Sequence, residues 1–458
     1  MSQWFAPAPP LARPARRDWK AWLAFATSVV LMITFSQGWV MALTGPDGDA
    51  EASTLIRTLY FPAYFAALVL GVTRLPQTLY AFMRTPLLWM LVGMVFVSVL
   101  WSTNPQVTER RGIAVLFTTL TGLVVASRYD WSELLEVFGA AFVILIFGSF
   151  LFGIALPSYG RMTTLFPGSW RGVWFEKNTL GANMSIATVV FCAAALLNPK
   201  RRWIWIGMIG LALALMLLSK SKTSLVALVL GMGALGAVLM ARRGPVFAVI
   251  TTFLGVSVLL VIGFLFYFDS DTLFALLGKD ATLTGRTKLW AAIMTQLNTR
   301  PWIGFGYSAV WSDPGVWGPL AWISKQAGFT AVHSHNSWLE IWVSLGYVGL
   351  GLWALYFVEV WVRGILATYR SPGGFLALPF LAIFSLMTLT ETVALVYNNF
   401  IWVMFVALGV KLATPAPALV AVPTPPMPAP APMAGSMDVA AAPPSAAPAR
   451  ANFAAPRP

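Results

Sequence analysis

Residues 203–267 read WIWIGMIGLALALMLLSKSKTSLVALVLGMGALGAVLMARRGPVFAVITTFLGVSVLLVIGFLFY. This stretch holds three apolar runs, 203–219, 224–241 and 245–267, separated only by short segments that carry Lys and Arg. The hydrocarbon core of a bilayer is about 30 Å thick and takes roughly 20 apolar residues per helix. Each run therefore has about the length of a membrane-spanning helix, which predicts that the chain crosses a membrane repeatedly.

The composition of the whole chain agrees with this interpretation. Of 458 residues, 58% are hydrophobic and only 10% are charged, with a mean hydropathy of +0.74. Soluble domains carry about 25% charged residues, so a water-soluble globular protein is excluded. The single cysteine, Cys192, excludes an intramolecular disulfide framework and a cysteine-cluster metal site. The only two histidines, His333 and His335, make a histidine-rich metal centre improbable.

The remaining apolar runs extend the pattern along the chain. We expect an all-α polytopic membrane protein with about twelve spans. The expected spans are 21–43, 57–73, 87–101, 112–126, 135–156, 179–197, 203–219, 224–241, 245–267, 337–362, 374–391 and 393–412. They divide the chain into an N-terminal arm (1–20), nine spans (21–267), a long external loop (268–336), three further spans (337–412) and a Pro/Ala-rich tail (413–458) that is expected to be disordered.

Lysine and arginine set the expected orientation. The loops on the side of the N-terminal arm carry about 15 basic residues and the short loops on the other side about 8, which places both termini in the cytoplasm. The net charge of +13 then reflects orientation and an anionic ligand rather than nucleic acid. The long loop faces outward in this topology. It contains an amphipathic stretch, 286–297, which is suited to a helix lying in the membrane interface, and turn-forming glycines within PWIGFGY at 301–307.

His335 is the first candidate for chemistry, because it directly precedes the expected span 337–362. Ser337 and Glu340 fit a capping box that would hold this histidine at the water–lipid boundary, where it could act as a general base. The alternative is a polar interfacial residue without a catalytic role. His333 is expected to be solvated in the loop. Gly346 is expected to serve close packing between helices through small residues, together with Gly349.

The second candidate feature is a set of cations on the side of the membrane that should be poor in them. These residues are Arg161, Arg171, Lys177, Lys220, Lys222 and Arg286. A diphosphate needs several positive donors, and arginine offers two parallel N–H groups. The alternative for each residue alone is a long side chain that extends from the interface to water. Glu359 and Glu391 are the clearest acids within the apolar runs, and so few intramembrane acids argue against a proton-coupled transporter.

At this point the sequence resembles a known family. HN at 335–336, nine intervening residues and GYVG at 346–349 look like the signature of the O-antigen ligase and polymerase superfamily. That signature reads His, then Asn, Ser or Gln, nine residues, Gly, two residues, and Gly, Thr or Tyr. GR at 285–286 and PWIGFGY at 301–307 are similar to the external loop of that family. WRGVWFEKNTLG at 170–181 and SKSKTS at 219–224 resemble the exopolysaccharide polymerases of the succinoglycan type more than the ligases, and the resemblance covers roughly residues 20–412.

The resemblance implies an inverting, metal-independent glycosyltransferase at the outer face of the bacterial inner membrane. Its donor would be a saccharide on undecaprenyl diphosphate, and it would need no cofactor. His335 would act as the base or orient the hydroxyl that attacks, and Arg286 would stabilise the departing diphosphate. Arg171, Lys177, Lys220, Lys222 and Arg161 would bind the diphosphate, with Asn178, Asn336 and Glu340 in supporting roles.

One position departs from the ligases, which carry an Arg with a Leu four residues on at the external end of a middle helix. Lys222 stands at that position and lacks the two-pronged guanidinium, which favours the polymerase branch. Arg161, with Leu165 after it, fits the same spacing from another loop.

Several alternatives remain open from sequence. A polymerase would use another lipid-linked unit as acceptor, and a ligase would use a lipid A core or a protein. Expected partners are membrane lipid, the lipid-linked saccharide, a flippase and a chain-length co-polymerase. A transporter could use the same cations to bind diphosphate without chemistry. A scaffold subunit of an export complex could dock through residues 413–458, whose deletion we expect to be tolerated.

Overall fold

The computed structural model describes residues 19–46, 48, 53–164, 166–268, 286–313 and 315–414. The expected arm at 1–20 and the expected tail at 413–458 lie almost wholly outside the described residues, as does the first part of the long loop, 269–285. Within the described part of the chain the regular structure is helical, and the only β pairing is an isolated bridge between Arg161 and Trp170.

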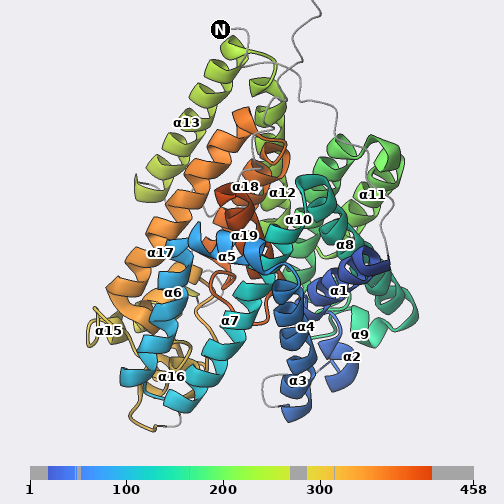
Figure 1. Ribbon diagram of the computed structural model, residues 1–458. Helices are drawn as coiled ribbons and strands as arrows, with labels where there is room; N and C mark the ends of the chain where they lie inside the picture. The colour runs from blue at the N-terminus through green and yellow to red at the C-terminus, as the bar shows by residue number, and fades with distance from the viewer. Residues whose placement is uncertain are drawn as a thin grey trace, which may run out of the picture. The chain divides into compact units, whose positions relative to one another are not determined.

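The first half of the described chain runs from α1 to α10 (Figure 1). Its helices are α1 (Trp19–Phe35), α2 (Val40–Thr44), α3 (Thr54–Leu59), α4 (Phe61–Val72), α5 (Leu75–Met83), α6 (Pro86–Val97) with the 3₁₀ turn η2 (Ser98–Trp101), α7 (Pro105–Arg128), α8 (Trp131–Ala155), α9 (Pro157–Gly160) and α10 (Lys177–Leu197).

The second half continues with the 3₁₀ turn η3 (Pro199–Arg201), α11 (Arg202–Leu218), α12 (Lys222–Ala241), α13 (Pro245–Phe268), α15 (Arg286–Leu297), η5 (Val310–Ser312), α16 (Pro319–Ala327), α17 (Ser337–Arg370), α18 (Gly374–Thr390) and α19 (Phe400–Ala413).

The helices fit a polytopic membrane protein, but the expected number of twelve spans is not confirmed. By length and composition, seven helical stretches of the described chain are long and apolar enough to cross a membrane. The count is eight if α5 and α6, which meet at an 86° bend, form one span. Four of the other expected spans coincide with shorter apolar helices, α1, the first part of α13, α18 and α19. Helix α5 itself was expected as a loop.

The expected span 393–412 is wrong in its first part. Residues 391–399 are not helical, and α19 begins only at Phe400, where the Asn399 side chain accepts a hydrogen bond from the amide of Trp402. The non-helical segment is nevertheless apolar and includes the buried residues Val393, Ala394 and Leu395. Hydropathy cannot separate such a buried loop from the helix that follows it, because both are equally shielded from water.

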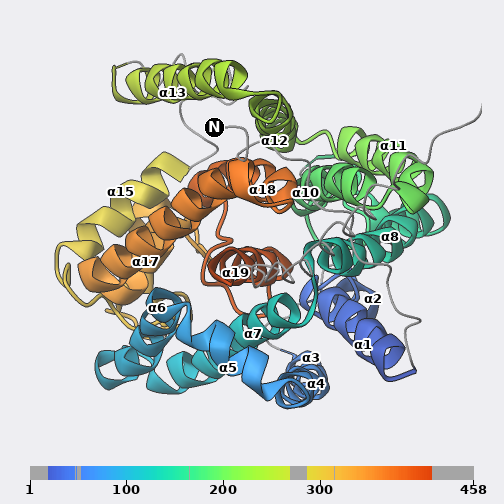
Figure 2. The same ribbon diagram turned by 45° about the horizontal axis from the view of Figure 1, so that its top comes forward.

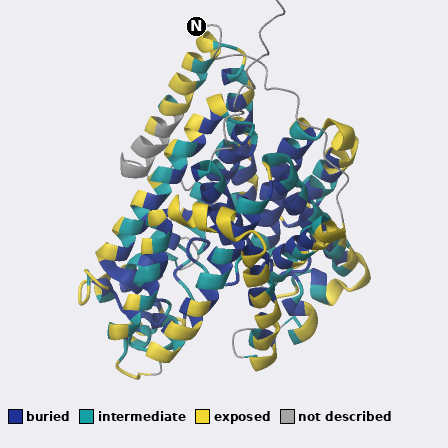
Figure 3. Ribbon diagram, in the orientation of Figure 1, coloured by how far each residue is buried: buried dark blue, intermediate teal, exposed yellow. Residues whose placement is uncertain are grey.

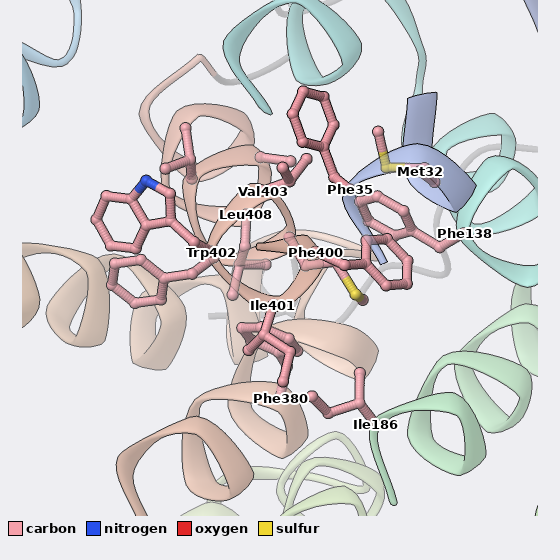
Figure 4. Close-up of a cluster of buried hydrophobic side chains, with 14 of the residues drawn as sticks. Met32, Phe35, Phe138, Ile186, Phe380, Phe400, Ile401, Trp402, Val403 and Leu408 are labelled. Atoms are coloured by element: carbon pink, nitrogen blue, oxygen red, sulfur yellow. The ribbon is translucent and has the colours of Figure 1, made fainter. Parts of the chain in front are cut away.

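Helix α19 forms the centre of the helical packing. Figure 2 shows it enclosed by neighbouring helices, and it contacts α1, α7 and α17. Every residue from Phe400 to Val410 is buried. The surrounding apolar cluster draws on α1, α8, α10, α18 and α19, as Figure 4 shows for Met32, Phe35, Phe138, Ile186, Phe380, Phe400, Ile401, Trp402, Val403 and Leu408. The protein core therefore lies around one helix that has no exposed face.

The outer faces of the peripheral helices are apolar and exposed, the reverse of a soluble protein. Figure 3 shows exposed residues on these outer faces and buried ones between the helices. Trp203 of α11 is 81% exposed and Phe253 of α13 is 74% exposed. Large exposed apolar surfaces mark contact with lipid or protein, and the length and number of these helices indicate a multi-pass membrane protein.

Helix α15 occupies the stretch for which an amphipathic helix is expected, with the same bounds. Much of its apolar side packs against other parts of the protein. Leu289, Ile293 and Leu297 are buried in a small second core that α15 forms with α16 and the first part of α17. The apolar stripe is therefore used for packing within the protein, and it fixes Arg286, the first residue of α15, relative to α17.

Candidate functional site

Three charged or titratable side chains meet where α15, α17 and α18 come together. Arg286 opens α15, His335 lies two residues before α17, and Glu391 directly follows α18. The Arg286 Nη2 atom is 3.1 Å from Glu391 Oε1, and His335 Nδ1 is 3.3 Å from Glu391 Oε2. Arg286 Nη2 also lies 3.4 Å from His335 Nδ1. We call these three residues the charge cluster. It joins residues 105 positions apart in sequence.

The backbone fixes the members of the charge cluster in place. Arg286 Nη1 donates to the carbonyl of Thr390 at 2.5 Å. The guanidinium therefore holds both the last residue of α18 and the carboxylate of Glu391. His335 has a φ of +52°, a left-handed backbone conformation that costs energy for a residue other than glycine. The hydroxyl of Ser337 donates to the Glu391 carbonyl and accepts from the amides of Val393 and Ala394. The start of α17 is thereby tied to the segment that carries Glu391.

Electrostatics keep the Glu391 carboxyl ionised. Burial by itself raises the pKa of this group, but the hydrogen bond from His335 and the charge of Arg286 outweigh burial, so the pKa is lowered below its usual value. A carboxylate beside an imidazole fixes the ring orientation and stabilises the imidazolium form. The charge cluster therefore has the elements of a proton-accepting dyad beside a guanidinium.

The expected capping box of Ser337 and Glu340 is wrong. Asn336 is the N-cap of α17, and its side-chain oxygen accepts from the amides of Trp338 and Leu339 at 2.9 and 3.2 Å. Both Asn and Ser favour this position, so sequence alone did not separate two adjacent candidates. Asn336 thus supports the site by fixing the helix directly after His335.

Glu340 connects two loops instead of capping the helix. Its carboxylate accepts from the Ser334 amide at 2.9 Å and from Trp311 Nε1 at 2.5 Å. The hydrogen bond from Trp290 Nε1 of α15 to the Ser334 carbonyl, at 2.9 Å, holds the same loop from the other side. The two histidines are therefore carried on a segment anchored at several points. His333 is not freely solvated as predicted, because its side chain is half-buried with an inaccessible Nδ1 atom and its ring centre lies 4.0 Å from that of His335.

Gly346 interrupts α17 rather than serving only close helix packing. Its φ of +65° breaks the helix, and a Cβ atom there would lie 2.2 Å from the backbone of Trp302. The segment 301–306 runs along this break. The amides of Phe305 and Gly306 donate to the carbonyls of Val343 and Ser344, both at 3.0 Å. The PWIGFGY segment is thus bound to the helix that follows His335, which gives the glycine of the 335–349 pattern a physical role.

A second group of predicted residues lies at the start of α10 and α12. Ser221 caps α12, and its hydroxyl donates to Asn178 Oδ1 at 3.0 Å. Asn178 and Ser221 line a small cleft together with Thr390 and Glu391. The structure therefore brings the starts of α10 and α12 close to Glu391 of the charge cluster.

Three lysines stand at the rim formed by these helix starts. Lys177 donates to the Lys220 carbonyl at 3.4 Å and lies over the Phe166 ring at 3.9 Å. Lys220 and Lys222 flank the cap residue Ser221 and are exposed. Helix N-termini and positive side chains both favour anions, so this rim is electrostatically suited to a diphosphate.

Arg171 and Arg161 are placed differently from these lysines. The buried guanidinium of Arg171 donates to the carbonyls of Tyr159 at 2.7 Å and Ser158 at 3.0 Å. Arg161 donates to the Gly153 carbonyl at 2.9 Å and lies over the Trp170 ring. Both side chains hold the loop between α8 and α10, and the structure does not bring them into the charge cluster.

A large cavity of about 1020 Å³ is lined in part by Thr392 and by residues 394–399. Its wall includes His333, Glu340, Thr392 and Tyr397, as well as residues from α3, α4 and α7. Sequence reasoning missed both this cavity and the role of Glu391. The signal for Glu391 was present, because it is one of very few acids in the apolar runs. Among the described residues no three His, Cys, Asp or Glu side chains are grouped closely enough to hold a metal ion.

Comparison with known proteins gives two matches. The family model described as O-antigen ligase matches residues 207–354, a range that includes Arg286, His335 and Gly346. The exopolysaccharide production protein ExoQ of Rhizobium meliloti (strain 1021) is 29% identical over 306 residues, which are 62% of this chain and 67% of that protein. Taken with the residue pattern at 335–349, these matches support the O-antigen ligase and polymerase superfamily as the family of this chain, and its exopolysaccharide branch within that family.

Proposed function

We propose that this protein is a glycosyltransferase of the bacterial inner membrane that polymerises undecaprenyl-diphosphate-linked repeat units into an exopolysaccharide at the periplasmic face. The observation that carries the proposal is the charge cluster of Arg286, His335 and Glu391 beside the cationic rim of α10 and α12. The similarity to an exopolysaccharide production protein supports a polymerase.

The donor places its diphosphate against the cationic rim and the guanidinium. A glycosyl diphosphate is already activated, because diphosphate is a good leaving group. The remaining task is to stabilise the negative charge that grows on the bridging oxygen as the bond to the anomeric carbon breaks. Arg286 is held rigidly for this purpose by Glu391 and the Thr390 carbonyl. Preorganised donors of this kind contribute roughly 10²–10³ in rate.

The acceptor hydroxyl attacks the anomeric carbon from the opposite side, which inverts the configuration there. One C–O bond forms, the C–O bond to diphosphate breaks, and the hydroxyl proton passes to the His335 imidazole. Glu391 stabilises the resulting imidazolium through its contact with Nδ1. The proton then leaves to water or to the released diphosphate, so the cycle needs no metal and no other cofactor.

The test compares strains that carry wild type, His335→Ala or Arg286→Ala in a deletion background. Lipid-linked saccharides are extracted and sized beside the secreted polymer. We expect both variants to accumulate single repeat units on the lipid carrier and to make no long polymer. Normal polymer in cells that express His335→Ala at wild-type level would remove the charge cluster from catalysis and favour a transporter.

A ligase is the second candidate, because the matching family model carries that description. A ligase would transfer a finished glycan to a lipid A core. In that case the variants would still make long polymer, and the polymer would remain on its lipid carrier instead of reaching the cell-surface acceptor. The same size analysis of lipid-linked and secreted saccharides therefore separates a ligase from a polymerase. As a polymerase, the protein would act beside a flippase and a chain-length co-polymerase.

A further inference from the structure

The large cavity has a wall of mixed charge, with Arg57, Arg110 and Arg111 together with Glu109 and Glu340. It is lined by aromatic, hydroxyl, amide and guanidinium groups from α3, α4, α7 and the segments 307–311 and 392–399. Its volume of about 1020 Å³ lies at the upper end of the range of small-molecule sites, which is roughly 300–1,000 Å³. A site of this size accommodates several sugar rings.

Two polar side chains in the cavity wall have no hydrogen-bond partner among the described residues. They are the Nδ1 atom of His333 and the Oγ1 atom of Thr392. Both residues line the cavity. Buried polar groups in proteins are nearly always hydrogen-bonded, so each exception calls for an explanation. Neither atom has appreciable accessible surface, so each would bond a ligand hydroxyl group, which both donates and accepts, once its side chain turns toward the cavity.

The backbone of the cavity wall is strained. Gln37, Ser308, Leu395 and Asn398 all have φ between +52° and +60°, and all four line the cavity. Only two other described residues besides glycine share this conformation, Lys220 at the cationic rim and His335 in the charge cluster. Such backbone conformations cost about 1–3 kcal/mol each and cluster at binding and catalytic sites. The cavity therefore has the backbone signature of a functional site.

Specific hydrogen bonds maintain this conformation. Asn398 receives a bond from Tyr64 Oη at 2.7 Å on its side chain, and its amide donates to Thr118 Oγ1 at 2.8 Å. The Tyr307 hydroxyl donates to the Leu395 carbonyl at 2.6 Å. Hydrogen bonds from Tyr64 and Tyr307 and to Thr118 thus hold residues 395–398 in this conformation.

The wall also offers the surfaces that sugars bind. The guanidinium of Arg111 lies 5.4 Å from the centre of the Tyr397 ring and donates to the Ser308 carbonyl at 2.8 Å. Tyr60 and Trp311 add further aromatic side chains to the lining. Arg111 covers the Tyr397 ring, and Tyr60 is stacked on Phe35 and Tyr64, so guanidinium and amide groups rather than ring faces would bond the hydroxyls of a sugar.

The cavity adjoins the charge cluster. Thr392 directly follows Glu391, and the ring of His333 lies 4.0 Å from the ring of His335. We propose that this cavity is the binding site for the acceptor saccharide, with His333 and Thr392 bonding its hydroxyls so that the attacking hydroxyl is presented to His335. This inference rests on the proposed glycosyl transfer, with the diphosphate at the cationic rim and the acceptor in the cavity.

The kinetic test separates acceptor from donor. The purified protein in lipid vesicles receives a radiolabelled lipid-linked repeat unit as donor and the free oligosaccharide, released from its lipid by mild acid, as acceptor. We expect His333→Gln to raise the KM for the free oligosaccharide about tenfold and Thr392→Val to raise it about threefold, since each loses one neutral hydrogen bond. The KM for the donor should stay unchanged. Thr188→Val is the matched control, because this buried hydroxyl of α10 bonds only within its own helix.

A binding measurement keeps the inference testable without turnover. Ile113 of α7 lines the cavity, so a cysteine placed there in a Cys192→Ser background reports on occupancy through its rate of reaction with a maleimide. We expect the free oligosaccharide to slow labelling severalfold in the otherwise wild-type protein and much less in His333→Gln.

The outcomes distinguish the two ideas. Protection without any sugar transfer would show that the cavity binds the saccharide and would overturn the proposed transferase, and with it the acceptor role of the cavity. Transfer by the wild type with no protection, or with an unchanged acceptor KM in both cavity variants, would overturn the acceptor site and leave the transferase standing. A rise in the donor KM alone would assign the cavity to the donor and likewise overturn the inference.

Discussion

Replacing Glu391 by Gln removes one charge from the charge cluster while keeping the side-chain volume. The amide oxygen can still accept from Arg286, but the amide nitrogen can only donate to His335 Nδ1, so the change removes the negative charge and reverses the hydrogen bond that orients the imidazole. Arg286 and His335 both lie close to this carboxylate, at 3.1 and 3.3 Å. We expect transfer to slow by about 10²–10³ at neutral pH.

The magnitude follows from the distances. Two unit charges 3.3 Å apart interact with about 5 kcal/mol at an effective dielectric constant near 20. This is the gross attraction between Glu391 and an imidazolium at His335, and desolvation of the pair offsets part of it. A net loss of roughly 3–4 kcal/mol in the transition state corresponds to the expected decrease, because each 1.4 kcal/mol is a factor of ten.

The assay measures single-turnover transfer of a radiolabelled lipid-linked unit in vesicles, across a range of pH. Glu359→Gln is the matched control, since it breaks another carboxylate contact, with Arg363 at 2.6 Å, within α17 and away from the site. The control should transfer at the wild-type rate. If Glu391→Gln transfers within threefold of wild type with the same pH profile, the carboxylate does not support a proton-accepting imidazole and the reasoning is wrong.

Three further predictions concern other parts of the structure. Arg286→Lys should lower transfer by about 10-fold or more, because an ammonium cannot bond the Thr390 carbonyl and a carboxylate with the fork of a guanidinium; steady-state rates check this, and a rate equal to wild type would contradict it. Gly346→Ala should destabilise the detergent-solubilised protein by about 3 kcal/mol or more through a backbone clash, whereas Gly351→Ala, with open space around its Cβ, should have little effect in the same thermal melt. Burial and the neighbouring imidazole lower the pKa of His333 in the folded protein. As the pH falls, the unfolded chain therefore takes up a proton at this residue before the folded protein does, so the free energy of unfolding should decrease below about pH 6.5. His333→Gln should remove that part of the decrease.

The sequence predicts those parts of the fold that depend on local hydrophobicity. Each of the twelve apolar runs overlaps an apolar helix, and the amphipathic stretch from Arg286 to Leu297 has the bounds of α15. These features follow from periodicity within one segment. The number of spans does not, because a run of given length can be a full span, a bent pair such as α5 and α6, or a short helix such as α19.

The site is predictable in part for the same reason. His335 and Arg286 are recognised by their positions beside apolar segments, and the structure shows that they meet. Their partner Glu391 lies 56 residues after His335, and only the tertiary packing of α15 and α18 against α17 brings it there. The break at Gly346 is equally non-local, since its cause is the backbone of residue 302. Contacts between residues so far apart in the chain produce no regular spacing that could be detected in the sequence.

The enclosure of α19 has a consequence for how the protein is made. All of its residues from Phe400 to Val410 are buried among helices that the ribosome produces earlier, including α1 and α7. These earlier helices lack a central packing partner until α19 is made. Final packing must therefore wait until synthesis has passed residue 413, and the segment that carries Glu391 is drawn into place by the same late event. A nascent chain whose arrest leaves Phe400–Ala413 inside the ribosome should accordingly be digested by a membrane protease much faster than one arrested after this helix has left the ribosome.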